Sequence, residues 1–201
     1  MGKFFFLAIL CVFIIANCSA ATLTTYINQK ASFMSISGAV QITDPYNGPN
    51  SVSSYSAPGP YGNVVFTQAT GVLWFASDWT ALLPGRDIAI NDVESIDVAL
   101  PFVSYSLGFD FVDANSDSTF RVYLRSGTSV IGSFDFNVPN DIASFIGVTS
   151  DVAFNNVQVR EISGDNTDDF YGMFYASQTS VPEPATILLA LLGIAWVAIK
   201  K

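Results

Sequence analysis

The chain has 201 residues, a formal net charge of −9 and only 12% charged residues, and its mean hydropathy of +0.41 is high for a soluble globular domain. It contains no histidine, and its two cysteines, Cys11 and Cys18, both lie near the amino terminus. These absences exclude most zinc sites, Ser/His and Cys/His catalysis, and disulfides in the central part of the chain. The chemistry left to the central part is that of carboxylates, hydroxyls, amides and aromatic rings.

Residues 1–20 have the pattern of a cleaved secretory signal peptide. Lys3 precedes an apolar run over residues 4–16, which is shorter than the roughly 20 residues that span a bilayer, and the small residues at 18–20 suit a signal peptidase. We expect cleavage after Ala20 or Ala21. Lipidation of Cys18 and an uncleaved anchor are the alternatives, and the polar Asn17 argues against lipidation.

Residues 181–201 have three parts: the motif Val181-Pro182-Glu183-Pro184, an uncharged apolar run over 185–199, and the basic end Lys200-Lys201. The two prolines prevent a helix before residue 185, and the lysines can stop translocation at a lipid surface. Fifteen residues rise only about 22 Å as a helix, which is short for a membrane span. A simple anchor helix is one interpretation of this segment.

The same arrangement resembles the PEP-CTERM sorting signal of Gram-negative bacteria. The resemblance covers about 21 residues and departs from the family in having two terminal lysines and no arginine. It implies a sorting motif at Val181, Pro182, Glu183 and Pro184, a basic stop at Lys200 and Lys201, and an exosortase-type processing enzyme as partner. It also implies that the helix holds the chain in the inner membrane before processing. The processed protein would then belong to the cell envelope or to an extracellular matrix containing exopolysaccharide or biofilm.

The acidic balance is strongest in residues 21–180, the expected passenger domain. Excluding Lys3, Glu183, Lys200 and Lys201 leaves 16 acidic and 5 basic residues, a charge of about −11. A surface with this charge repels the phosphates of nucleic acids and anionic lipids. We therefore expect no nucleic-acid partner.

The passenger domain is expected to be all-β, because its apolar residues recur with a period of two along the chain. The alternation is clearest over 105–111, 120–125 and 157–161. Further strands are expected at 32–37, 63–68, 71–76, 87–91, 95–100, 129–136 and 170–176. The segment 39–62 is expected to form long loops, and 140–145 is the one place where a helical turn is expected.

Eight to ten short strands in 160 residues predict an antiparallel β-sandwich of jelly-roll type, with the signal peptide and the hydrophobic sorting helix at its two ends. The runs 96–112, 120–136, 145–154 and 168–175 also resemble passenger domains found on PEP-CTERM proteins. That resemblance concerns the fold and brings no catalytic residue with it.

Two acidic loops have oxygen-bearing residues at spacings that suit calcium. Asp113, Asn115 and Asp117 supply oxygens at every second residue, although the EF-hand pattern fails at Ser118 and Leu124. Asp165, Asp168 and Asp169 form the second candidate. The competing interpretation is that both loops are simple turns. No other cofactor is expected.

Exposed aromatic rings on loops are the candidates for carbohydrate binding. Trp79 and Tyr61 are the predicted contact residues, with Tyr46 and Tyr55 on the preceding loops, whereas Trp74 is expected in the core. Glycoside hydrolysis needs a carboxylic acid in an apolar pocket, and the sequence marks none. The sequence therefore favours a non-catalytic exported envelope or matrix protein, and a lectin-like module for exopolysaccharide is the alternative.

Overall fold

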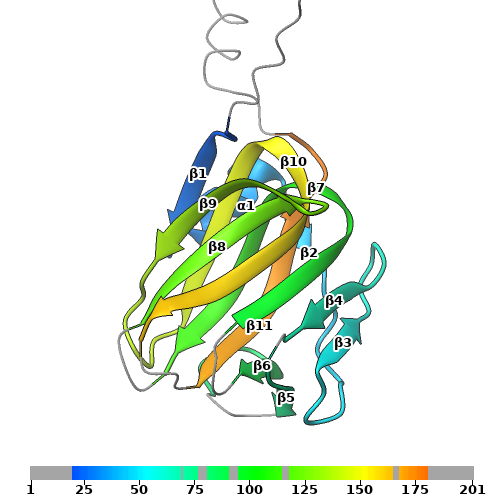
Figure 1. The fold of residues 1–201 in the computed structure, drawn as a ribbon, viewed down its shortest axis with the longest axis vertical. Helices are drawn as coiled ribbons and strands as arrows, with labels where there is room; N and C mark the ends of the chain where they lie inside the picture. The colour runs from blue at the N-terminus through cyan, green and yellow to red at the C-terminus, as the bar shows by residue number, and fades with distance from the viewer. Residues whose placement is uncertain are drawn as a thin grey trace, which may run out of the picture.

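The computed structural model describes residues 20–68, 70–76, 81–90, 95–114, 118–164 and 168–180. Within these residues the chain is mostly β-structure with one α-helix (Figure 1). The elements are β1 (Leu23–Ile27), α1 (Lys30–Ser37), β2 (Val40–Gln41), β3 (Ser54–Ala57), β4 (Val64–Thr67), β5 (Leu73–Ala76), β6 (Asp87–Ile90), β7 (Ser95–Asp113), β8 (Thr119–Ser126), β9 (Ser129–Phe136), β10 (Ser144–Ser163) and β11 (Asp169–Ser177). This confirms the prediction of an antiparallel β domain, and its jelly-roll type stays a prediction.

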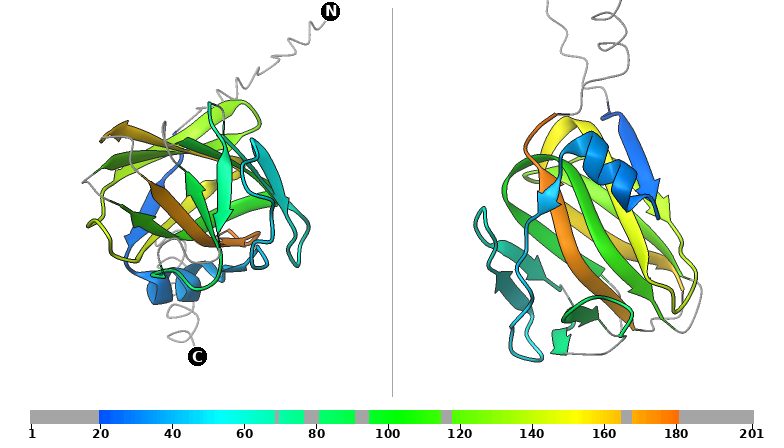
Figure 2. Two further views of the ribbon diagram at one scale, coloured as in Figure 1. Left: turned by 90° about the horizontal axis from the view of Figure 1, so that it is seen from below. Right: turned by 180° about the vertical axis from the view of Figure 1, so that it is seen from behind.

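The strands form one continuous antiparallel sheet that folds into two layers, because its two longest strands take part in both (Figure 2). The first layer has the order β9, β8, second half of β10, first half of β7, β4 and β3. The second has the order β1, first half of β10, second half of β7, β11, β6 and β5, and β2 pairs with the end of β11. Register shifts between Thr149 and Asn156 mark where β10 passes from one layer to the other.

The main core lies between the layers and is rich in phenylalanine. Phe109, on β7, is 1% exposed, and its ring stacks on that of Phe174 with the centroids 5.3 Å apart. Phe111 meets Phe120 edge-to-face at 5.1 Å, and so connects the two layers. Alternation along β7 places these rings inward and Gly108 and Asp110 outward, as the period-two pattern predicts.

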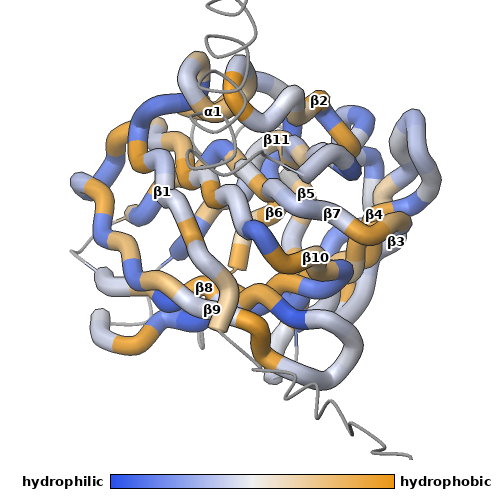
Figure 3. The backbone as a smooth tube through the Cα atoms, turned by 90° about the horizontal axis from the view of Figure 1, so that it is seen from above, coloured by the Kyte–Doolittle hydropathy of each residue, from blue (hydrophilic) through white to orange (hydrophobic). Residues whose placement is uncertain are grey.

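Helix α1 covers the outer face of the second layer (Figures 2 and 3). Its buried residues, Phe33 and Ser37, are four positions apart and so share one side of the helix. Phe33 lies over two directly paired glycines, Gly108 and Gly147. A Cβ atom on either glycine would come within 2.9 Å of the Phe33 ring. The two glycines therefore create the space in which the helix packs.

Three sequence predictions are corrected by the fold. Residues 32–37 belong to α1 and not to a strand, because Phe33 finds a helical packing site on the sheet. The expected long loops over 39–62 contain β2 and β3, which add short strands to β11 and β4. The expected helical turn at 140–145 is a tight turn at 140–141, and β10 begins at Ser144.

Both ends of the described chain lie at the same end of the domain (Figure 1). Thr24 of β1 pairs with Thr149, which pairs with Ser106, which in turn pairs with Ser177 of β11. No helix among the described residues is long and apolar enough to cross a membrane. The predicted signal peptide at 1–20, apart from Ala20, and the predicted sorting segment at 181–201 lie outside the described residues.

Candidate functional site

Tyr61 is presented on a tight loop between β3 and β4. Its side chain is 52% exposed, and its ring meets Phe102 edge-to-face with the centroids 5.9 Å apart. The loop is closed by a hydrogen bond from Gly62 N to Gly59 O, and Gly62 has a φ of 115°, which favours glycine. The loop therefore holds an exposed aromatic ring in a fixed position.

Close backbone contacts anchor this loop to the domain. A Cβ atom on Gly59 would lie 1.9 Å from the carbonyl oxygen of Ile42, so only glycine fits there. Ile42 is in turn tied to β11, because its N–H donates to Phe174 O at 2.8 Å. On the other side, a Cβ atom on Gly62 would lie 3.1 Å from Pro101.

A pocket of about 210 Å³ lies beside the Tyr61 ring, and we call it the Tyr61 pocket. Tyr61 and Phe102 form its aromatic wall. Gly38 and Val40 line it after the end of α1, and the residues at and after the end of β11 add hydroxyl and amide groups. Its lining residues are Gly38, Val40, Tyr61, Phe102, Ala176, Ser177, Gln178 and Thr179. None of these residues is charged, so the pocket offers stacking and neutral hydrogen bonding.

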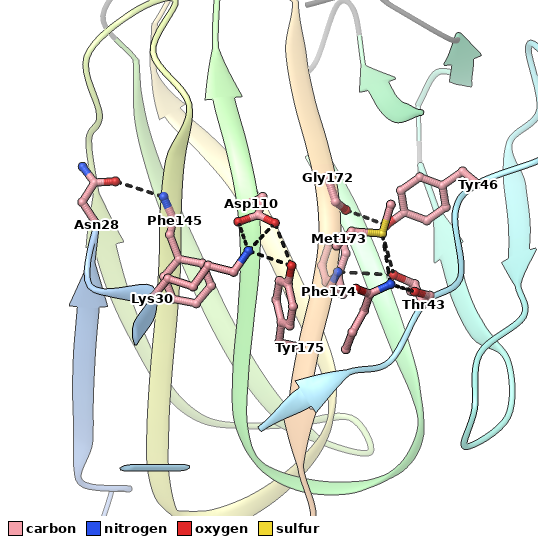
Figure 4. Close-up of polar contacts among 11 residues, drawn as sticks. Asn28, Lys30, Thr43, Tyr46, Asp110, Phe145, Gly172, Met173, Phe174 and Tyr175 are labelled. Atoms are coloured by element: carbon pink, nitrogen blue, oxygen red, sulfur yellow. Dashed lines mark hydrogen bonds and ion pairs between the residues drawn. The ribbon is translucent and has the colours of Figure 1, made fainter. Parts of the chain in front are cut away.

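A polar cluster lies on the outer face of the second layer, below the start of α1 (Figure 4). Lys30 Nζ donates to both carboxylate oxygens of Asp110 at 2.8 Å and to the hydroxyl of Tyr175 at 2.7 Å. Tyr175 donates to Asp110 Oδ2 at 3.0 Å. The Lys30 side chain is 41% exposed and that of Asp110 only 10%. The cluster is thus an ion pair with a phenol as third member.

The protonation of this cluster follows from its contacts. Burial lowers the pKa of Lys30, but its hydrogen bonds to Asp110 and Tyr175 outweigh burial, and the net pKa lies above the ordinary value. Burial is the main reason that the pKa of Tyr175 is also raised. At neutral pH, Lys30 is therefore an ammonium ion and Tyr175 a protonated phenol.

A second hollow, of about 500 Å³, lies above this cluster, and we call it the Lys30 cleft. Its buried lining is part polar, from Asp110 and Ser144, and part apolar, from Leu83 and Phe145, and Leu82 and Ile142 are exposed at its rim. The lining residues are Asn28, Lys30, Leu82, Leu83, Pro84, Asp110, Ile142, Ala143, Ser144 and Phe145. The sequence pattern does not predict this site, although Lys30 is one of only five basic residues in the domain, a signal that could have marked it.

The other predicted aromatic candidates have different positions. Tyr46 is buried, and its hydroxyl donates to Gly172 O at 2.7 Å (Figure 4). Burial raises the pKa of Tyr46 far above its ordinary value. Tyr55 is half-buried with its ring 4.4 Å from that of Phe75. Both tyrosines are therefore structural, and Trp79 lies outside the described residues.

The prediction that Trp74 belongs to the core is wrong. Trp74 is 37% exposed, whereas its neighbours Leu73 and Phe75 are buried. Alternation along β5 turns those two side chains inward and the indole outward. Trp74 is thus an exposed aromatic residue on a sheet edge, away from the residues that line the Tyr61 pocket.

Asp113 and Asp169, one from each predicted calcium loop, lie side by side at one end of the second layer. Asp113 and Asp169 are fully buried and pair directly across β7 and β11. Asp113 Oδ2 accepts a hydrogen bond from Ser118 N at 3.0 Å, which is the role expected of a turn residue. Asn115, Asp117 and Asp165 lie outside the described residues, and the described acidic residues, Asp168 included, form no group of three or more suited to a metal ion. Calcium binding stays a prediction.

The outer face of the first layer carries charged residues that bind one another. Arg121 donates to both carboxylate oxygens of Asp135, at 2.6 and 2.8 Å, and this contact lowers the pKa of Asp135. Gln158 accepts from Arg125 at 2.7 Å and donates to Asp97 at 3.2 Å. These contacts occupy the polar groups of this face, so we do not place the functional site there.

No protein-family model matches the chain, and no curated protein matches it. The chain is similar in structure to the catalytic domain of a GH87 α-1,3-glucanase, with 9% identity, a TM-score of 0.40, and coverage of 72% of this chain but only 30% of that one. It is also similar to the family 11 carbohydrate-binding module of the Clostridium thermocellum cellulase Lic26A-Cel5E, with 10% identity, a TM-score of 0.43, and coverage of 73% and 98%.

A variant of the carbohydrate-binding module CBM29-2 is a further similar structure, with 9% identity, a TM-score of 0.38, and coverage of 81% of this chain and 96% of that one. The sequence identities and TM-scores are too low to transfer a function or a binding residue from any of these proteins to this chain.

Proposed function

We propose that this chain is a non-catalytic exported protein whose β domain binds a neutral carbohydrate in the Tyr61 pocket. The observation that carries the proposal is the half-exposed ring of Tyr61, held on a loop that Gly59 and Gly62 fix against the domain. An aromatic face that is already fixed in position stacks on a sugar ring with little loss of conformational entropy. Ser177, Gln178 and Thr179 supply hydroxyl and amide groups for sugar hydroxyls.

The preference for a neutral glycan follows from charge. The Tyr61 pocket has no charged lining residue, and the whole chain carries −9. An anionic polysaccharide would meet repulsion and no cation in this pocket. The non-catalytic assignment is part of the proposal, and Asp113 and Asp169 are too deeply buried to reach a glycan.

Replacing Tyr61 with alanine is expected to weaken binding to a neutral polysaccharide tenfold or more, which corresponds to about 1.4 kcal/mol. Affinity electrophoresis of the full chain in a sugar-free detergent, with soluble β-glucan and xylan in the gel, measures the effect. Tyr61→Phe keeps the ring and should retain most of the affinity. Trp74→Ala is the matched control, because it removes another exposed aromatic ring from a sheet edge. Equal binding by Tyr61→Ala and the wild type would refute the proposed pocket.

We further propose that export and sorting follow the two terminal segments. The signal peptide directs export, and the segment from Val181 to Lys201 is processed by an exosortase-type enzyme, which releases the protein to the cell envelope or to an exopolysaccharide or biofilm matrix. The motif Pro182-Glu183-Pro184 supports this proposal, because prolines disfavour a helix and the apolar run that follows is too short for a stable span.

Changing Pro182, Glu183 and Pro184 together to alanine is expected to prevent processing. The helix could then extend towards residue 182, which lengthens the apolar span to about 18 residues and removes the recognition motif. Mass spectrometry should find the full-length variant in the inner membrane, whereas the native surface protein should lack Lys200 and Lys201. Native surface protein that still ends at Lys201 would show that the segment is only an anchor.

A further inference from the structure

We propose that the Lys30 cleft is a second binding site, for a neutral polyhydroxy ligand of the size of one sugar ring. The proposal rests on the fixed polar groups and the apolar side chains that together line this cleft. It does not depend on carbohydrate binding in the Tyr61 pocket, which lies beyond the other end of α1, at Gly38.

The floor of the cleft combines opposite charges that cancel. Lys30 Nζ and Asp110 Oδ1 are 2.8 Å apart, so the pair presents a donor and an acceptor side by side without net charge. Asp110 Oδ1 accepts one described hydrogen bond, from Lys30, and a carboxylate oxygen can accept a second. Tyr175, beneath the pair, holds both groups in place. This floor favours a hydroxyl group over an ion.

Asn28 adds an oriented donor at the edge of the floor. Its Oδ1 accepts a hydrogen bond from Phe145 N at 3.0 Å (Figure 4), and its backbone has a φ of 55°. Because the oxygen is fixed on β10, the orientation of the side-chain amide is fixed as well, and Asn28 Nδ2 has no hydrogen bond to a described residue. Ser144 contributes a hydroxyl that donates to Ile142 O at 3.3 Å and can accept a hydrogen bond from a ligand.

The rim suits the C–H groups of a sugar ring. Leu82 and Ile142 are exposed on it, and Pro84 is a further apolar lining residue of the cleft. A cleft of about 500 Å³ is within the usual range for small-molecule sites. Apolar side chains around a few fixed donors and acceptors are the usual composition of such sites.

The decisive variant is Asn28→Asp. It keeps the oxygen that binds Phe145 N and tolerates the left-handed backbone, but it replaces the donor Nδ2 by a charged oxygen. Asn155→Asp is the matched control, because Asn155 Oδ1 also accepts a backbone hydrogen bond, from Gly127 N at 3.0 Å, and does not line the cleft. Both variants therefore add one charge and keep the oxygen that accepts a backbone hydrogen bond.

The probe is methyl β-D-glucopyranoside, titrated into the full chain in a sugar-free detergent while methyl NMR signals of Leu82, Leu83 and Ile142 are followed. We expect saturable shifts at these methyls, unchanged by Asn155→Asp and weakened at least tenfold by Asn28→Asp. Tetrahydropyran, the same ring without hydroxyls, and glucuronate, its anionic counterpart, should both bind more weakly.

Any of three results would overturn the proposal. These are methyl signals that show no chemical-shift change, equal affinity in the two asparagine variants, and tetrahydropyran that binds with the same affinity as the glucoside. Lys30→Met is a second variant with an intact apolar stem, and it should also weaken the shifts tenfold or more. Tyr61→Ala should leave the shifts at Leu82 and Ile142 unchanged. The experiment therefore distinguishes an incorrect proposal for this cleft from an incorrect proposal for the Tyr61 pocket.

Discussion

Phe109→Ala is expected to lower the free energy of unfolding by about 3–5 kcal/mol. Phe109 is 1% exposed, and its ring contacts those of Phe136, Tyr171 and Phe174 as well as that of Phe111. Truncation removes the central ring of this group and leaves a cavity that the neighbouring rings, on β7, β9 and β11, cannot fill without moving. Urea unfolding followed by far-UV circular dichroism measures the change.

Val103→Ala is the control for this experiment. Val103 lies on the same strand but is one of the most exposed apolar residues of the domain. Its truncation is expected to change the free energy of unfolding by at most about 0.5 kcal/mol. If both variants lost the same stability, the assignment of the core to the rings between the two layers would be wrong.

Much of the sheet could be predicted from local pattern. Residues 120–125 alternate between buried and less buried positions along β8, because one face of that strand packs on the core. Residues 105–111 belong to β7 as the pattern predicts, but 106–111 are all buried, because α1 covers the face that points away from the core. The same rule, applied to Leu73, Trp74 and Phe75, would have placed the indole outside. That error came from treating a large aromatic residue as core without regard to its position in the alternation.

Helix α1 could not be predicted in this way. Only Phe33 and Ser37 are buried within it, which gives too weak a period for a local pattern. What makes the segment a helix is the space over Gly108 and Gly147, which lie far away in the sequence and come together only when β7 pairs with β10. Tertiary packing decides the local structure here.

The candidate sites also differ in whether local sequence pattern or only the tertiary fold reveals them. Tyr61 was found from sequence because an aromatic residue between glycines and prolines marks an exposed turn. The Lys30 cleft was missed because Lys30 and Asp110 are 80 residues apart, and Lys30 and Tyr175 are 145 apart. Asp113 and Asp169, by contrast, were both singled out, but only the register of β7 and β11 shows that they pair.

Gly59→Ala is expected to abolish carbohydrate binding in the Tyr61 pocket while the domain stays folded. The new Cβ would lie 1.9 Å from Ile42 O and 2.9 Å from its carbonyl carbon, and backbone atoms cannot rotate away as side chains can. Ile42 is held by its hydrogen bond to β11, and Asp44 N donates to Pro58 O at 2.9 Å, so the loop carrying Tyr61 must move. Overpacking of this kind costs about 1–3 kcal/mol of stability.

Gly127→Ala separates loss of stability from loss of the pocket. Gly127 has a φ of 59°, with no atom within 4 Å of an added Cβ, and it lies in the turn between β8 and β9. Its replacement costs about 1–2 kcal/mol through backbone strain alone and leaves the pocket lining untouched. Affinity electrophoresis and thermal unfolding on both variants should therefore show lower stability in each and a binding loss of tenfold or more only in Gly59→Ala. Full binding by Gly59→Ala would mean that the fixed position of the Tyr61 ring is irrelevant to recognition.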